Sequence, residues 1–271
     1  MVIAEWGLKM PPPVHGAARL KQPFEEKAHM SSGRGAMKRI QCLIVLLVAL
    51  LASCTTVQVK NAQEITASAP TIRFAPEIEA FLKEDRINPP PQQAILFIGS
   101  SIFREWTHLK EQMDPLPVFN RAFGGSWTAD ILQHMDKVVL PYQPRIIVYY
   151  CGSNDINGSE KPVPIFLRVK QFCERVQVKL PDTRIYYVSI NRAPQKKDRW
   201  DIVDSTNALV REFCSTGKNL GFIDVNPLLF DKENRPRMEL YRSDQLHLTD
   251  RAYEEFAAVI KPIIERSWMS K

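Results

Sequence analysis

Signatures of metal and nucleotide binding are absent from this sequence of 271 residues. It contains no HExxH or CxxC pattern, no P-loop and no glycine-rich dinucleotide fingerprint. We therefore expect no metal and no cofactor. An internal repeat is also lacking, and the composition is that of an ordinary globular protein, with 45% hydrophobic and 24% charged residues.

An excess of positive charge is nearly missing from the main part of the chain. The net charge is +6, but the first 53 residues hold seven basic and three acidic side chains, so they account for +4. The remaining +2 is too small for an electrostatic footprint on a polyanion. We therefore expect no nucleic-acid partner.

No apolar run is long enough to span a bilayer comfortably. The apolar stretch from Ile40 to Leu51 follows a short basic start at Met37 and ends in Leu51-Ala-Ser-Cys54, as in a secretory signal. That ending resembles a bacterial lipobox, which implies lipidation of Cys54, a membrane anchor and a place in the cell envelope, on the periplasmic side of the outer membrane. An uncleaved N-terminal anchor is the alternative. The expected segments are an upstream extension (1–36), a lipoprotein signal (37–53), a lipid-bearing tether (54–74) and one catalytic domain (75–271).

Cysteine is scarce in that domain. Cys151, Cys173 and Cys214 are an odd number, which argues against a full disulfide framework. We expect buried free thiols, and a single disulfide remains the alternative.

Short apolar runs alternate with helical patterns throughout the domain. Strands are predicted over 94–98, 118–123, 145–151, 184–190 and 220–225. Helices are predicted over 75–85, 103–113, 128–140, 163–180, 202–216 and 249–268. This alternation predicts right-handed βαβ units and a three-layer α/β/α fold with a five-stranded parallel sheet. In the order 2-1-3-4-5, the ligand crevice lies beyond the carboxyl ends of strands one and three.

Polar turns follow the first three strands. They are Gly99-Ser100-Ser101, Gly124-Gly125-Ser126 and Gly152-Ser153-Asn154-Asp155. A serine hydroxyl needs a general base, and that base needs a carboxylate to hold its productive tautomer. Asp244 and His247 are spaced to supply both from one turn. The sequence therefore predicts a hydrolytic site of the serine type.

These blocks, taken in order, resemble the SGNH (GDSL-type) esterase superfamily over residues 90–265. The resemblance implies a flavodoxin-like fold and hydrolysis of carboxylic esters. It implies Ser101 as nucleophile with His247 and Asp244, and an oxyanion hole formed by Ser101, Gly125 and Asn154. One departure is visible, since Ser100 stands where the family usually has aspartate. The G-x-S-x-G elbow of α/β-hydrolases is absent.

Other residues carry weaker expectations. Ser100, Trp127 and Asp155 are possible rim residues of the substrate site, although Asp155 more readily braces its own loop. Arg121 is expected to face solvent, and the loop 195–200 is expected to be a solvated charge run.

The predicted substrate is a short-chain acyl or lysophospholipid ester. A carbohydrate or cell-wall O-acetyl ester is the alternative, and a non-catalytic envelope binding protein is a third possibility. The sequence predicts no oligomeric state.

Overall fold

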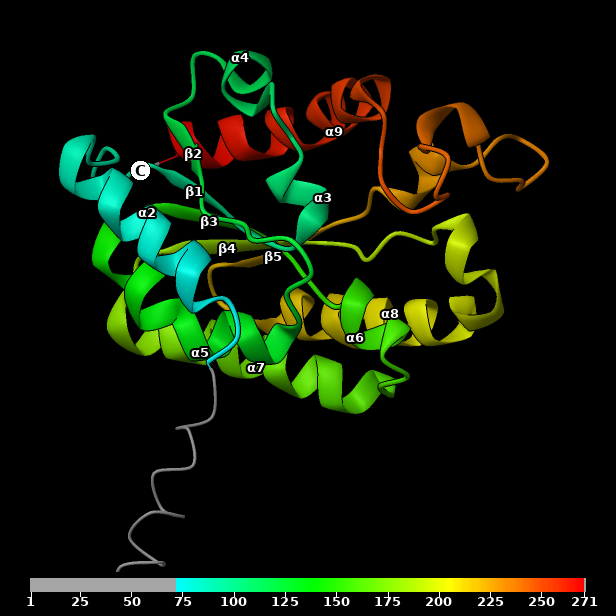
Figure 1. The fold of residues 1–271 in the computed structure, drawn as a ribbon, viewed down its shortest axis with the longest axis horizontal. Helices are drawn as coiled ribbons and strands as arrows, with labels where there is room; N and C mark the ends of the chain where they lie inside the picture. Colours follow the sequence, from blue (N-terminus) through cyan, green and yellow to red (C-terminus); the bar gives the residue numbers. More distant parts are fainter. Residues whose placement is uncertain (1–71, 271) are drawn as a thin grey trace, which may run out of the picture. The chain divides into compact units, whose positions relative to one another are not determined.

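The protein is described here over residues 72–270 of a computed structural model. Five parallel strands form one sheet in the order β2-β1-β3-β4-β5, as predicted (Figure 1). The strands are β1 (Ile95–Gly99), β2 (Val118–Asn120), β3 (Ile146–Tyr150), β4 (Arg184–Val188) and β5 (Leu220–Ile223). Continuous apolar runs form the central strands because both faces of a parallel sheet are covered.

Helices cover both faces of the sheet (Figure 1). Helices α3 (Ser101–Arg104), α4 (Leu109–Met113) and α9 (Asp250–Met269) lie on one face. The other face is covered by α2 (Ala75–Ile87), α5 (Thr128–Val138), α6 (Ser153–Asn157), α7 (Pro162–Lys179) and α8 (Trp200–Thr216). Short 3-10 segments are η1 (Leu140–Tyr142), η2 (Pro194–Arg199), η3 (Asn226–Leu229) and η4 (Met238–Leu240). The three-layer α/β/α prediction is therefore confirmed.

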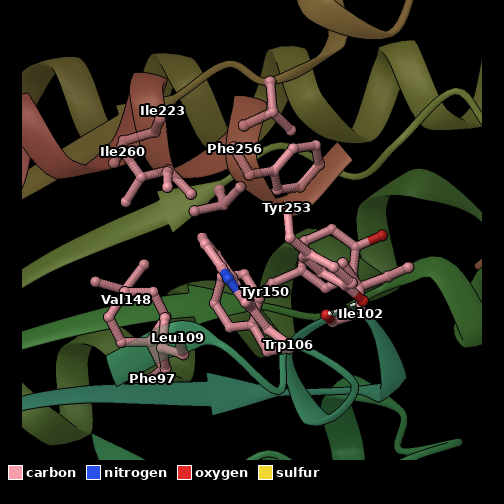
Figure 2. Close-up of a cluster of buried hydrophobic side chains, with 14 of the residues drawn as sticks. Phe97, Ile102, Trp106, Leu109, Val148, Tyr150, Ile223, Tyr253, Phe256 and Ile260 are labelled. Atoms are coloured by element: carbon pink, nitrogen blue, oxygen red, sulfur yellow. Dashed lines mark hydrogen bonds between the residues drawn. The ribbon is translucent and has the colours of Figure 1, made fainter. Parts of the chain in front are cut away.

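Alternate residues of β3 enter two separate cores. Val148 and Tyr150 face α9, whereas Ile147 and Tyr149 face α5 and α7. Figure 2 shows the α9 side, where the Trp106 and Tyr253 rings stack with centroids 5.4 Å apart. This packing fixes the sheet between its two helical layers.

The predicted helix over 103–113 was wrong in one respect, because it is broken into α3 and α4. Trp106 lies between them, buried against Phe97 with ring centroids 5.8 Å apart. Its indole N–H donates to Gln112 Oε1 at 2.6 Å. Burying the indole in the core takes precedence over continuing the helical stripe.

Arg121 contradicts the expectation of a solvent-facing side chain, since it is 6% exposed. Its guanidinium forms an ion pair with Asp85 of α2 and donates to the Tyr142 hydroxyl at 3.3 Å. Sequence periodicity could not identify this partner, which lies 36 residues away.

The cysteine expectation is confirmed within the described residues. Cys151, Cys173 and Cys214 are free and buried, and burial raises the pKa of each thiol. No helix between residues 72 and 270 is long and apolar enough to cross a bilayer. The predicted signal segment and Cys54 lie outside the described residues.

The predicted tether ends too late in the sequence. Phe74 packs on Phe123, with ring centroids 5.1 Å apart, and Arg73 pairs with Asp130 at 3.0 Å. The last residues assigned to the tether are therefore part of the folded domain.

Candidate active site

The turn after β1 depends on a glycine. Gly99 has φ 151°, and a Cβ built there would lie 1.8 Å from the Tyr150 carbonyl oxygen. No other residue tolerates this close approach of β1 to β3. Chain reversal at this point makes Ser101 the first residue of α3, at the carboxyl end of the central strand.

Ser101, His247 and Asp244 form a continuous hydrogen-bonded chain. His247 Nε2 lies 2.9 Å from Ser101 Oγ, and His247 Nδ1 lies 2.6 Å from Asp244 Oδ2. These distances suit proton transfer from a serine to an imidazole that a carboxylate orients. The structure thus brings together the three residues that were predicted to act as nucleophile, base and acid.

A tight turn holds Asp244 beside His247. Asp244 Oδ1 accepts the backbone N–H groups of Leu246 and His247, at 3.0 and 2.9 Å. The left-handed conformation of Gln245, φ 58°, allows the chain to turn back. Burial opposes the Asp244 charge, but the hydrogen bonds from the His247 ring and the two backbone N–H groups outweigh it and lower the pKa to about 2. Asp244 is therefore ionised at neutral pH.

Three candidate hydrogen-bond donors follow the carboxyl ends of the neighbouring strands β1, β2 and β3: the backbone N–H groups of Ser101 and Gly125 and the side-chain amide of Asn154. Across residues 72–270, neither the Ser101 nor the Gly125 backbone N–H donates to another group. Gly125 has φ 78°, a left-handed value that favours glycine. The Asn154 side-chain amide donates to the Ser126 carbonyl at 3.0 Å, which leaves its second N–H without a partner in the described residues. Such donors can stabilise a developing oxyanion.

A carboxylate that sequence reasoning missed also faces His247. Glu105 Oε1 lies 3.9 Å from His247 Nε2. Arg104 and Arg242 hold this carboxylate at 3.0 and 2.7 Å. Its position four residues after Ser101 was the only signal in the sequence, and the partner Arg242 lies on a distant loop. The rim of the site is therefore charged on this side.

The expected rim residues divide into two groups. Ser100 is 1% exposed and Asp155 is 0% exposed, so burial contradicts a rim position for both. The Ser100 hydroxyl is buried without a hydrogen-bond partner. Trp127 is half-buried at the start of α5, beside Gly158, and its rim role stays a prediction.

Asp155 braces its loop, as the alternative reading expected. Its carboxylate accepts the Thr128 N–H at 3.1 Å, the Thr128 hydroxyl at 2.5 Å and an Arg168 N–H at 3.1 Å. Burial raises the Asp155 pKa, and these hydrogen bonds offset part of the rise. The bond to Thr128 ties the Asn154 turn to the start of α5.

Replacing Asp155 by alanine is expected to lower the free energy of unfolding by about 2–4 kcal/mol, because it leaves buried donors without a partner. Chemical denaturation measures this loss. Asp198→Ala is the matched control, since the Asp198 side chain is 74% exposed. Equal stability of the two variants would contradict the bracing role.

The loop 195–200 differs from the expected solvated charge run, most clearly at Lys196. Lys197 and Asp198 are exposed, but Lys196 is 1% exposed. Its ammonium donates to Ser153 Oγ at 2.8 Å. The residue next to Asn154 therefore has a buried cation as its partner. No group of three or more potential metal ligands occurs in the described part of the chain.

Comparison with known families and structures gives a consistent result. The profile of the GDSL-like lipase/acylhydrolase family matches residues 98–255. Comparison with the curated proteins gave no match.

Among solved structures, a candidate acylhydrolase from Bacteroides fragilis is 19% identical, with a TM-score of 0.61, covering 73% of this chain and 97% of its own. A structure described as a candidate platelet activating factor from Streptococcus pneumonia is also 19% identical, with a TM-score of 0.62, covering 78% and 99%. A GDSL-like lipase from Bacteroides thetaiotaomicron is 18% identical, with a TM-score of 0.58, covering 70% and 98%.

At these identities the three structures support the fold, and the family match covers more than half of the chain, from the end of β1 to beyond the His247 turn. The protein therefore belongs to the GDSL-like lipase/acylhydrolase family of the SGNH superfamily and is a hydrolase acting on ester bonds.

Proposed function

We propose that the protein hydrolyses carboxylic esters through a Ser101–His247–Asp244 triad. The observation that carries the proposal is the unbroken hydrogen-bonded chain from Ser101 Oγ through the imidazole to the Asp244 carboxylate. A non-catalytic binding protein on the same fold has no need for this geometry.

In this mechanism His247 Nε2 takes the proton of Ser101 as Oγ attacks the ester carbonyl. The oxyanion accepts hydrogen bonds from the backbone N–H groups of Ser101 and Gly125 and from the free amide N–H of Asn154. His247 then gives its proton to the leaving alcohol. Water attacks the acyl-enzyme with the same base, and the serine is restored.

The direct test combines p-nitrophenyl acetate hydrolysis with a fluorophosphonate, in which serine attacks phosphorus and fluoride leaves. We expect hydrolysis to stop when one equivalent is bound, with the adduct on Ser101 by tandem mass spectrometry. An adduct on Ser100, or no hydrolysis before labelling, would reject the mechanism.

Asn154→Ala is expected to lower kcat by about 10²–10³-fold with a small change in KM, because the lost donor acts mainly in the transition state. Initial rates on p-nitrophenyl acetate measure both constants. Asn157→Ala, on the same short helix, is the matched control and should retain wild-type rates. An unchanged kcat for Asn154→Ala would exclude this residue from the oxyanion hole.

The charged rim bears on the substrate class. Glu105 lies beside His247, the residue that protonates the leaving alcohol, and Arg104 and Arg242 pair with Glu105. A polar leaving group fits this setting, so we favour acyl esters of polar alcohols. Lysophospholipids, which release a glycerophospho alcohol, and O-acetylated carbohydrates both have such a leaving group, and relative kcat/KM on the two distinguishes them.

We also propose that the enzyme is anchored in the cell envelope by a lipid on Cys54. Support comes from the basic start, the apolar stretch and the Leu51-Ala-Ser-Cys54 sequence. Metabolic labelling with an alkyne fatty acid should mark the wild type and the Cys42→Ser control, but not Cys54→Ser. Label retained by Cys54→Ser would contradict lipidation at this residue.

A further inference from the structure

Lys196 is a buried cation without a counter-ion. The residue is 1% exposed, and its ammonium donates to Ser153 Oγ at 2.8 Å and to Gln195 Oε1 at 3.4 Å. Among residues 72–270 it forms no ion pair with a carboxylate. Removing an ammonium from water is costly unless a partner compensates, so such a group usually has a function or an anionic neighbour.

The Lys196 loop connects the two turns that form the active site. Ser153 is the first residue of α6, directly before Asn154. On the other side, the Gln195 N–H donates to the carbonyl of Gln245 at 3.1 Å, within the turn that holds Asp244 and His247. The segment Gln195–Lys196 therefore contacts both the turn that carries Asn154 and the turn that carries His247.

The charged groups around Lys196 come from few elements. Arg199, on the same 3-10 segment, adds to burial in lowering the Lys196 pKa to about 8. Asp198 lines the same polar pocket of about 250 Å³ but is directed to solvent. From β3, the Tyr150 hydroxyl lies beside Ser153. Asp155 of α6 is engaged by Thr128 and Arg168, so it does not compensate the lysine.

We propose that Lys196 is a positioning residue of ester hydrolysis, which holds the Ser153 hydroxyl and so aims the adjacent Asn154 amide at the oxyanion. The inference rests on the proposed function. A protonated Lys196 must donate to Ser153, and this fixes the first turn of α6. This positioning acts in the transition state and leaves substrate binding largely unchanged.

The kinetic test compares Lys196→Met with Lys197→Met in the full chain. Lys196→Met should lower kcat for p-nitrophenyl acetate by about tenfold or more, with KM within about twofold. Lys197→Met should match the wild type, because that side chain is exposed. Thermal unfolding must show that both variants are folded. If Lys196→Met misfolds, Ser153→Ala, which removes the same contact, takes its place and should show the same drop in kcat.

The pH profile separates positioning from simple packing. A lysine that loses its proton near pH 8 should produce a fall in the wild-type kcat on the alkaline side. Lys196→Met should show a low kcat without that fall. An unchanged kcat, or the same alkaline fall in Lys196→Met, would overturn the inference.

A measurement without turnover distinguishes this inference from the proposed function. The side-chain amide signal of Asn154 in ¹H–¹⁵N spectra should shift with a midpoint near pH 8 in the wild type and not in Lys196→Met. If the signal responds but no ester is hydrolysed, the proposed function fails and the positioning contact stands. If esters are hydrolysed and the Asn154 signal does not respond, the positioning inference fails.

Discussion

Ser101→Ala is expected to reduce kcat/KM for p-nitrophenyl acetate by about 10⁴-fold or more. The substitution removes the only hydroxyl that lies within hydrogen-bond distance of His247 Nε2 among the described residues, at 2.9 Å. Residual hydrolysis should remain above the uncatalysed rate, because the proposed donors, Gly125 and Asn154, would still bind the oxyanion. Steady-state rates at high enzyme concentration measure this remaining activity.

Ser100→Ala is the matched control for this prediction. The two serines are adjacent, but the Ser100 hydroxyl is buried and forms no hydrogen bond among residues 72–270. We expect its loss to change kcat/KM by less than about twofold, since no reacting group depends on it. A loss of activity in Ser100→Ala with retention in Ser101→Ala would reverse the assignment of the nucleophile.

His247→Ala is expected to lower kcat by about 10⁴-fold as well, with little change in KM. Without the imidazole, the Ser101 hydroxyl has no base, and the leaving alcohol has no proton donor. Glu105, 3.9 Å from Nε2, is paired with Arg104 and Arg242 and is poorly placed to substitute. The effects of His247→Ala and Ser101→Ala should not add in the double variant, because both residues act in one step.

His108→Ala is the control for removing a histidine, since His108 is exposed on the surface beside Glu111. It should leave kcat unchanged. If His247→Ala retained more than about a tenth of the wild-type kcat, general-base catalysis by this residue would be excluded.

The pKa of Asp244 shows where this carboxylate can affect the pH dependence of activity on the acid side. Its pKa of about 2 lies below the ordinary value of 3.8, because the His247 ring and backbone N–H groups stabilise the carboxylate. This contribution to stability is fully present above pH 3.8 and is lost as the pH falls towards 2. Loss of activity above about pH 4 therefore does not come from protonation of Asp244.

The sheet and the chemical groups at its end were predictable from local patterns. The apolar run before Gly99 indicated a strand buried on both faces, and the alternation of strands with helices indicated a parallel sheet of right-handed βαβ units. Ser101, Gly125 and Asn154 each follow a strand end, so the order 2-1-3-4-5 places them together. Asp244 and His247 were recognisable because their spacing is local.

Two of the missed contacts join segments distant in sequence. Arg121 finds Asp85 across 36 residues, and Lys196 finds Ser153 across 43. A charged side chain in a loop is ordinarily solvated, so only the folded structure shows that these two cations are buried. Trp106 is similar, since its burial against Phe97 and Tyr253 interrupts a helix that periodicity alone would continue.

The separation of Ser101 and His247 along the chain has a consequence for folding. The two residues meet across 146 positions, and the strands and helices between them must be in place before the pair can form. Closing so long a loop costs entropy that only the assembled core repays. Recovery of esterase activity during refolding should therefore lag behind the recovery of helical structure, and activity becomes a reporter of the last assembly step.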